Sequence, residues 1–297
     1  MSESFDADWL QLREPFDGRA RSVPLALLLA DALPVRPRIV DLGAGTGALF
    51  RWLAPYIGRT QIWTLVDSSA ALLDRAFDDV ADAADRVGWT VTLPKPHIML
   101  VHTPVGVWRV ESQVADLSEA PGNLKLDQVD GVVSTALCDL VSRPWVARMA
   151  AALRVPFYAA LNVDGHEGFF PPHPQDKLVA QGFRRDQNRD KGFGGRALGP
   201  AAPGFLAQAF RAQGFSVTTA PSPWRIAAAT PAMAEALADG HADAALRALP
   251  RALAPAVEDW RKARQLQAAR GGLMARVGHT DLLALPPAMP KPTRVIN

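Results

Sequence analysis

Cysteine is almost absent from this chain, and so is any surplus of charge of one sign. The one cysteine, Cys138, has no partner for an internal disulfide. Lys and Arg number 32 against 30 Asp and Glu, a net charge of +2, which gives the chain no general attraction to nucleic acid or to a membrane surface. The apolar run Leu25–Ala30 is too short to span a bilayer, and the first thirty residues carry acids instead of a basic start. We therefore expect a cytoplasmic protein without disulfides.

Length and composition favour one large α/β domain with additions. The chain has 297 residues, of which 48% are hydrophobic, enough for a substantial core. Strand-like and helix-like segments alternate from residue 38 onward. We predict an N-terminal helical cap over 1–37, a main domain over 38–285 with insertions near 89–107, 162–199 and 230–270, and a tail over 286–297.

A glycine-rich turn is the strongest local signal. The apolar stretch Arg38–Leu42 predicts a strand, and the helical pattern that starts at Ala48 predicts a helix. Between them lies Gly43-Ala44-Gly45-Thr46-Gly47. Glycine permits positive φ and close approach of another molecule, and the N–H groups at a helix start face whatever binds there.

The same turn also fits a dinucleotide site, because Gly43, Gly45 and Ala48 satisfy the G-x-G-x-x-G/A pattern. Asp41 favours a different ligand. Its carboxylate, just before the turn, would repel a pyrophosphate and attract a cationic amino acid moiety.

Asp67 supplies the second signal. It ends the apolar strand Gln61–Asp67 at roughly the 20-residue offset from the glycines at which a carboxylate meets ribose hydroxyls in nucleotide-binding folds. Ser68 and Ser69 then open a helix.

Together, Val40–Gly47 and Leu65–Ser68 resemble the motifs of class I S-adenosylmethionine-dependent methyltransferases. The resemblance implies a Rossmann-like, doubly wound α/β fold with a seven-stranded mixed sheet whose last strand is antiparallel. It also implies S-adenosylmethionine as the methyl donor. The cofactor-binding residues that it implies are Arg21, Asp41, Gly43, Ala44, Gly45, Thr46, Gly47, Asp67, Ser68, Asp116, Leu117, Ser134 and Ala136. Arg13 and Arg19 are alternatives to Arg21 for the methionine carboxylate, and Glu111 is the alternative to Asp116 beside the adenine.

The later elements are predicted from pattern. Strands joined by hairpins are expected within 89–117, a fourth core strand at Val129–Ser134 and a fifth at Phe157–Leu161. Separate helices are expected over 231–238, 242–249 and 255–270. A sixth strand is expected at Phe215–Thr219, and the closing strand, 273–285, should run antiparallel beside it.

Two residues are candidates for catalysis. Asp139 follows the fourth strand, and His166 lies in the segment predicted as a loop after the fifth, where an imidazole could act as a general base. The Asn or Asp followed by Pro-Pro and an aromatic, common in methyltransferases that act on nucleic-acid bases, is missing from Ser134 onward. No metal site is predicted, because Asp164, His166, Glu167 and His173 match no standard ligand spacing.

The sequence does not identify the methyl acceptor. Residues 184–196 hold five basic and two acidic side chains, which suits an anionic small molecule as well as a solvated loop. A small polar or anionic molecule is the first hypothesis, RNA or protein methylation the second, and an NAD-dependent oxidoreductase the third. Neither nucleic acid nor membrane is expected as a partner, and the oligomeric state is left undetermined.

Overall fold

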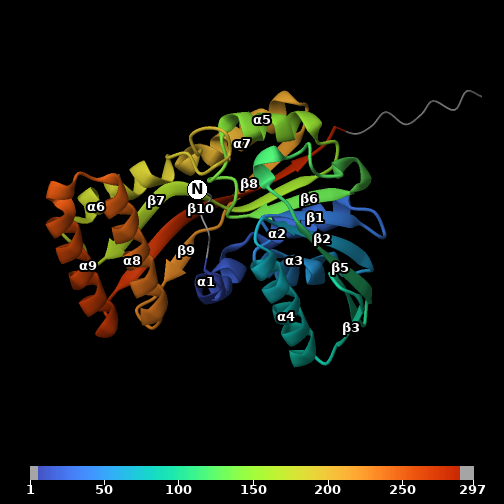
Figure 1. Ribbon diagram of the computed structural model, residues 1–297, viewed down its shortest axis with the longest axis horizontal. Coiled ribbons are helices and arrows are strands. Elements are labelled where there is room, and N and C mark those ends of the chain that lie inside the picture. The colour runs from blue at the N-terminus through green and yellow to red at the C-terminus, as the bar shows by residue number, and fades with distance from the viewer. Residues whose placement is uncertain (1–5, 288–297) are drawn as a thin grey trace, which may run out of the picture.

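A computed structural model describes residues 6–287, which form one mixed α/β sheet flanked by helices (Figure 1). Residues 288–297, most of the predicted tail, and residues 1–5 lie outside the described range. The strands are β1 Arg38–Leu42, β2 Gln61–Asp67, β3 Thr90–Lys95, β4 Ile98–Thr103, β5 Gly106–Val114, β6 Gly131–Thr135, β7 Phe157–Phe170, β8 Ser216–Pro221, β9 Trp224–Ile226 and β10 Met274–Leu285. The helices are α1 Ala7–Ala20, α2 Val23–Ala32, α3 Ala48–Ile57, α4 Ala70–Arg86, α5 Arg143–Ala152, α6 Asp176–Gln187, α7 Ala202–Ala212, α8 Pro231–Ala248 and α9 Ala254–Ala269.

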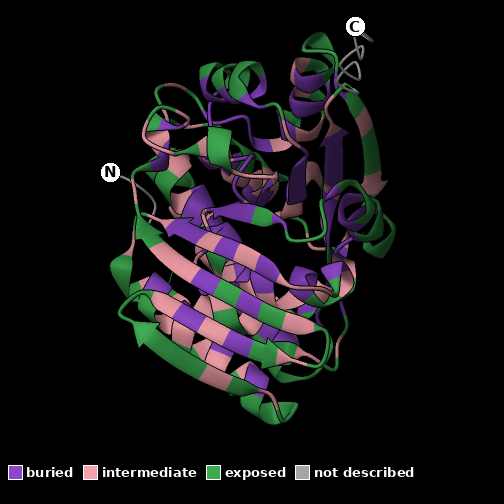
Figure 2. Cartoon of the chain, turned by 90° about the vertical axis from the view of Figure 1, so that its right-hand side faces the viewer, coloured by how far each residue is buried: buried purple, intermediate pink, exposed green. Residues whose placement is uncertain are grey.

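The strand order confirms the predicted fold. It is β3-β4-β5-β2-β1-β6-β7-β10-β8, with β9 paired to β10. β5, β2, β1, β6 and β7 pair with one another in parallel, β4 is antiparallel to β5, and β10 runs antiparallel between β7 and β8. Seven of these strands form the predicted doubly wound sheet, and the hairpin strands β3 and β4 together with β9 bring the described sheet to ten. The edge strand β3 is mostly exposed, unlike the central strands (Figure 2).

Helices cover both faces of the sheet, and each face has its own core. α2, α3 and α4 pack on one face around Leu29, Phe50 and Trp63. α5 and α7 pack on the other around Trp145 and Phe210. The order of the strands places the reversal of winding between β1 and β6, so the ends of these strands and their neighbours are where a ligand is expected.

A third core lies in an appendage made by α6, α8 and α9 with the outer ends of β7 and β10 (Figure 1). Here two predictions were wrong. The fifth strand does not end at Leu161 but continues to Phe170, because the outer part of β10 pairs with residues 167–170. Residues 231–248 form one helix, since Gly240 is tolerated inside an alanine-rich segment that packs against α6.

The N-terminal helices are fastened to the sheet by Asp281 of β10. This fully buried carboxylate accepts hydrogen bonds from Ser22 N (2.8 Å), Leu161 N (2.8 Å), the Tyr158 hydroxyl (3.0 Å) and the Ser222 hydroxyl (2.5 Å). Its position therefore fixes where α1 and α2 meet the sheet. Nowhere in residues 6–287 is a helix both long and apolar enough to cross a membrane.

Candidate cofactor and acceptor site

The glycine turn follows β1 directly, as predicted. Gly43, Gly45 and Gly47 have φ of +70°, +53° and +75°, conformations that side chains with a Cβ rarely adopt. The turn is bonded to the next strand, because Gly43 N and Ala44 N both donate to Val66 O, at 2.9 and 3.0 Å. The start of α3 is thus held at the carboxyl end of β1 beside the end of β2.

Asp67 joins the turn to the helix after β2. One carboxylate oxygen accepts from Gly45 N at 2.9 Å, and the other accepts from Ser69 N at 3.0 Å. The side chain is only partly buried, so its remaining lone pairs face the open side of the sheet. Asp116 follows β5, where its carboxylate accepts from Ser118 N at 2.8 Å.

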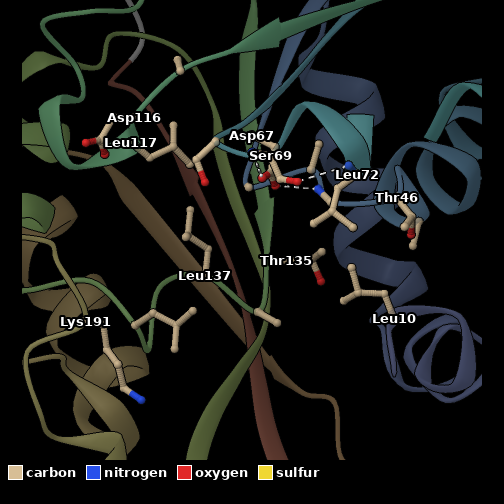
Figure 3. A pocket seen from close by; sticks show the side chains of 18 of the residues that line it. Leu10, Thr46, Asp67, Ser69, Leu72, Asp116, Leu117, Thr135, Leu137 and Lys191 are labelled. Atoms are coloured by element: carbon tan, nitrogen blue, oxygen red, sulfur yellow. Dashed lines mark hydrogen bonds between the residues drawn. The ribbon is translucent and has the colours of Figure 1, made fainter. Parts of the chain in front are cut away.

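One cavity of about 720 Å³ gathers these features (Figure 3). Nine of the predicted cofactor-binding residues line it: Gly43, Ala44, Gly45, Thr46, Asp67, Ser68, Asp116, Leu117 and Ala136. Four predicted residues do not line it: Arg21, Asp41, Gly47 and Ser134. Gly47 precedes α3, and the Ser134 hydroxyl lies 3.5 Å from Cys138 Sγ in the core.

Helix α1 closes one end of the cavity with Leu10, Arg13 and Asp17. Of these, Arg13 was named above as an alternative to Arg21, and Leu10 and Asp17 were not predicted. Leu10 Cδ1 would lie 3.2 Å from a Cβ placed on Gly45, so the helix rests directly on the turn. Glu14, which pairs with Arg51 of α3, holds the helix there. The spacing Arg13-Asp17-Arg21 at four-residue steps was the available signal in the sequence.

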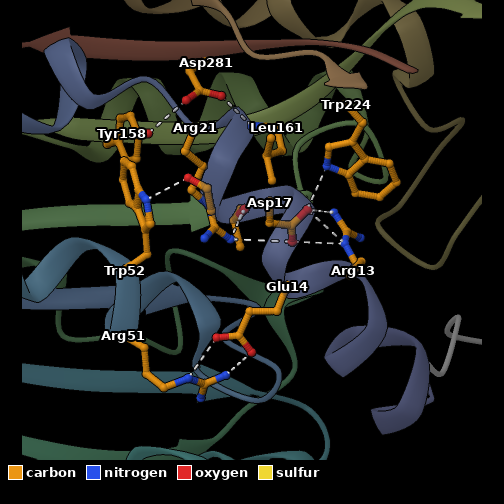
Figure 4. Close-up of polar contacts among 12 residues, drawn as sticks. Arg13, Glu14, Asp17, Arg21, Arg51, Trp52, Tyr158, Leu161, Trp224 and Asp281 are labelled. Carbon is orange, nitrogen blue, oxygen red and sulfur yellow. Dashed lines mark hydrogen bonds and ion pairs between the residues drawn. The ribbon is translucent and has the colours of Figure 1, made fainter. Parts of the chain in front are cut away.

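Asp17 is the centre of a buried cluster (Figure 4). Arg13 Nε donates to it at 3.1 Å, Trp224 Nε1 donates at 3.0 Å, and Arg21 Nη2 lies 3.7 Å away. The Arg13 guanidinium also stacks on the Trp224 ring at 4.8 Å. Two arginines therefore share one carboxylate at this end of the cavity.

Arg21 and Asp41 are buried behind the cavity wall with unused hydrogen-bonding atoms. Arg21 Nη2 donates to Thr135 Oγ1 at 3.2 Å, but its Nε and Nη1 have no acceptor. Both carboxylate oxygens of Asp41 are without a donor. Burial, reinforced by Asp67 and opposed by Arg21, raises the pKa of Asp41 to about 8. Buried polar atoms without partners are costly, so these atoms mark a place where a ligand or water is expected.

The two candidate catalytic residues are not brought together. Asp139 is buried in the turn after β6 and does not line the cavity. The His166 side chain is 82% exposed and hydrogen-bonds with Asp164 on the outer part of β7. The prediction of a loop at His166 was wrong, because this residue lies within β7.

The cavity wall opposite α1 was only partly anticipated. Leu137 and Leu140 follow β6, and Lys191, Gly192 and Phe193 come from the segment after α6. That segment lies within the predicted insertion 162–199, and its glycines and local positive charge were the available signals. Figure 3 shows Lys191 on the side of the cavity away from Leu10.

No family model and no curated protein matches this chain. Solved structures that resemble it include a cyclopropane synthase from Mycobacterium tuberculosis, with 15% identity, coverage of 94% of each chain and a TM-score of 0.43. A geranyl diphosphate C-methyltransferase from Streptomyces coelicolor has 13% identity, a TM-score of 0.42 and coverage of 89% of this chain and 80% of that one. A phosphoethanolamine N-methyltransferase from Haemonchus contortus has 14% identity, a TM-score of 0.43 and coverage of 94% of this chain and 57% of that one. At these TM-scores the likenesses carry no argument about function, which depends on the chain's own site.

Proposed function

We propose that this protein is an S-adenosylmethionine-dependent methyltransferase that acts on a small polar or anionic molecule. One observation carries the proposal: a single cavity joins the glycine turn after β1 to Asp67 after β2 and Asp116 after β5. The segments after three neighbouring strands thus line one cavity. The first is a glycine turn whose backbone a ligand can approach closely, and the other two each carry a carboxylate. Carboxylates accept hydrogen bonds from ribose hydroxyls and from an exocyclic amino group.

The unpaired buried atoms of Asp41 and Arg21 suit a ligand that is zwitterionic at one end. Both side-chain oxygens of Asp41 lack donors, which an ammonium group supplies, and Nε and Nη1 of Arg21 lack acceptors, which a carboxylate supplies. A methionine moiety carries both groups. A pyrophosphate has no hydrogen-bond donor to offer the Asp41 oxygens. We therefore assign the amino acid end of the cofactor to the part of the cavity nearest Asp41 and Arg21, beside Gly43 and Thr135, and the adenosine end to Asp67, Asp116 and Leu117.

S-adenosylmethionine supplies an electrophilic methyl group on a sulfonium. The chain's own contribution is orientation and exclusion of water. Leu10 on α1 covers the glycine turn, while Leu137, Leu140 and Phe193 give the opposite wall an apolar surface. An acceptor whose nucleophilic atom carries no proton at neutral pH needs no base, which agrees with a cavity lined by neither Asp139 nor His166.

Calorimetric titration tests the cofactor. Wild-type protein is expected to bind S-adenosylmethionine and S-adenosylhomocysteine and to show no comparable affinity for NAD. Gly45→Ala should weaken binding, because Gly45 has φ +53° and Leu10 lies 3.2 Å from the added Cβ. Gly88→Ala is the matched control: Gly88 has φ +74°, no atom within 4 Å of the added Cβ and no place in the cavity. Preferential NAD binding, or equal effects of the two substitutions, would overturn the proposal. A methyl-transfer screen with mass detection of the product then identifies the acceptor.

A further inference from the structure

Two cationic side chains line the cavity among the described residues, Arg13 and Lys191. Arg13 is bonded to Asp17 on its own helix and lies over the Trp224 ring, so α1 already holds it. Lys191 reaches the cavity from the opposite wall (Figure 3). The proposed binding of the cofactor uses neither of them, and Lys191 is the one on the wall opposite α1.

Lys191 is buried in the cavity wall and does not extend into solvent. Its side chain is 4% exposed, although lysine ammonium groups usually extend into water. Its Nζ forms an ion pair with Asp186 at 3.2 Å. Asp186 also forms ion pairs with Arg189 at 3.1 Å and with Arg247 at 3.2 Å. Burial raises the pKa of Asp186, but the hydrogen bonds and charges of Arg247 and Lys191 outweigh it, so the pKa lies below its usual value. The carboxylate therefore stays ionised and keeps Lys191 in place.

The segment that carries Lys191 is held against the turn after β6. The Ser142 hydroxyl donates to Phe193 O at 2.7 Å, and Leu198 N donates to Val141 O at 2.9 Å. Gly192, next to Lys191, has φ +97° and no atom within 4 Å of where a Cβ would lie. Backbone conformation alone requires glycine there, and the space beside it opens on the cavity.

The surroundings of Lys191 combine charge with apolar surface. Leu137, Leu140 and Phe193 line the same wall. Over 184–196, five basic residues stand against two acidic ones, a local surplus of positive charge. Such a wall suits a ligand with one anionic group and an apolar body.

We propose that Lys191 binds an anionic group of the methyl acceptor, carboxylate or phosphate, while Leu137, Leu140 and Phe193 hold the acceptor's apolar part. This assignment rests on the proposed methyltransferase function. It makes the acceptor a small amphiphilic anion. A nucleic acid would need a continuous row of cations, whereas the cavity offers one on this wall.

The test begins with S-adenosylhomocysteine, which saturates the cofactor end. Hexanoate and hexyl phosphate are then titrated as anionic probes, with hexanol as the neutral analogue of equal chain length. Wild-type protein should bind at least one anionic probe roughly ten-fold more tightly than hexanol. The stronger of the two probes distinguishes a carboxylate acceptor from a phosphate acceptor.

Lys191→Met should remove that preference, while S-adenosylhomocysteine affinity stays within about two-fold of wild type. Lys177→Met removes the same charge from an exposed position on α6 and should change neither. If Lys191→Met does not fold, ¹³C-labelled lysine in the wild-type protein provides the readout, with Lys191→Arg identifying the signal. The Lys191 Cε resonance should then shift with the anionic probes and not with hexanol.

Equal binding of hexanol and both anions, or a preference that survives in Lys191→Met, would overturn the assignment. So would tight binding of a short single-stranded RNA that Lys191→Met abolishes. Failure of wild-type protein to bind S-adenosylhomocysteine is a separate result, which counts against the methyltransferase proposal itself.

Discussion

The backbone N–H of Gly45 donates to Asp67 Oδ2 at 2.9 Å, which joins the glycine turn to the carboxylate that ends the neighbouring strand. The other oxygen of Asp67 accepts from Ser69 N at 3.0 Å. One side chain thus sets the relative positions of the starts of α3 and α4. The residue assigned to the ribose is also the residue that shapes the turn.

Asp67→Asn should therefore weaken cofactor binding strongly and stability only modestly. The amide keeps one acceptor oxygen but loses the charge, and a hydrogen bond to a charged group is worth about 1.5–3 kcal/mol. We expect the Kd for S-adenosylmethionine to rise roughly ten-fold or more. Asp74→Asn, at an exposed position on α4, removes the same charge outside the cavity and should leave the Kd unchanged. Titration calorimetry measures both, and equal Kd values for the two variants would contradict the assignment of Asp67.

Binding of the cofactor should release a proton through Asp41. The carboxyl is fully buried, with a pKa raised to about 8, so it is protonated at neutral pH before a ligand arrives. An ammonium group placed against it favours the ionised form and lowers that pKa. At about pH 7, calorimetry in buffers of different ionisation enthalpy should show release of up to one proton per cofactor bound. Asp41→Asn should release none and bind more weakly; an identical buffer dependence in the two proteins would contradict the role.

The same carboxyl should make the ligand-free protein less stable as the pH rises. The folded state keeps the proton up to a pKa of about 8, while the unfolded chain loses it near 3.8. The contribution to stability is therefore complete below the lower value and declines through this window, by an upper bound of roughly 6 kcal/mol. The difference in unfolding free energy between Asp41→Asn and wild type should grow in the variant's favour over the same range.

His279 should produce the opposite slope at acid pH. Burial and the nearby Arg13 lower its pKa to about 4, against weaker opposing effects of Asp17 and Asp164. The unfolded chain takes up the proton near 6.5 and the folded state only near 4, so stability falls as the pH drops between these values, by up to about 3 kcal/mol. His279→Gln should lose less stability than wild type between about pH 7 and pH 4.5, as measured by urea unfolding. His102→Gln, at an exposed position, should follow wild type, and parallel curves for all three proteins would exclude His279 as the source.

The sequence predicted the parts of this fold in which local pattern and position coincide. β1, the glycine turn, β2 and the antiparallel β10 lie where predicted, because short apolar strands and turn glycines are encoded within a few residues. The outer half of β7 was missed, since its polar and glycine-rich residues resemble a loop and become a strand only through pairing with β10.

The predicted site shows the same division. Residues contiguous with the strand ends, such as Gly45 and Asp67, were found from spacing. Arg13, named only as an alternative to Arg21, and Lys191 reach the cavity through contacts between distant segments: α1 lies over the turn, and the segment after α6 lies against that after β6. No local pattern encodes such contacts, so the choice of Arg13 over Arg21 as a lining residue, and the place of Lys191, required the structure.

Two glycines in the appendage should respond in opposite ways to the same substitution. A Cβ on Gly182 of α6 would lie 2.6 Å from Ala245 Cα and 2.7 Å from its Cβ, so the close approach of α6 to α8 depends on glycine. Gly240 of α8 has no atom within 4 Å of the added Cβ. Gly182→Ala should destabilise by about 1–3 kcal/mol through overpacking, whereas Gly240→Ala should stabilise by about 0.5–1 kcal/mol through helix propensity.

Gly182→Ala should also affect binding of the acceptor and binding of the cofactor differently. α6 ends beside Asp186, which holds Lys191, so displacing α6 disturbs the wall assigned to the acceptor. Gly182→Ala should therefore weaken the preference for anionic probes and leave S-adenosylhomocysteine binding within about two-fold of wild type, because the glycine turn and Asp67 lie on other elements. Chemical denaturation and calorimetry measure the two effects, with Gly240→Ala as the control. A shift in the same direction for both variants would show that α6 and α8 do not depend on the close approach at Gly182.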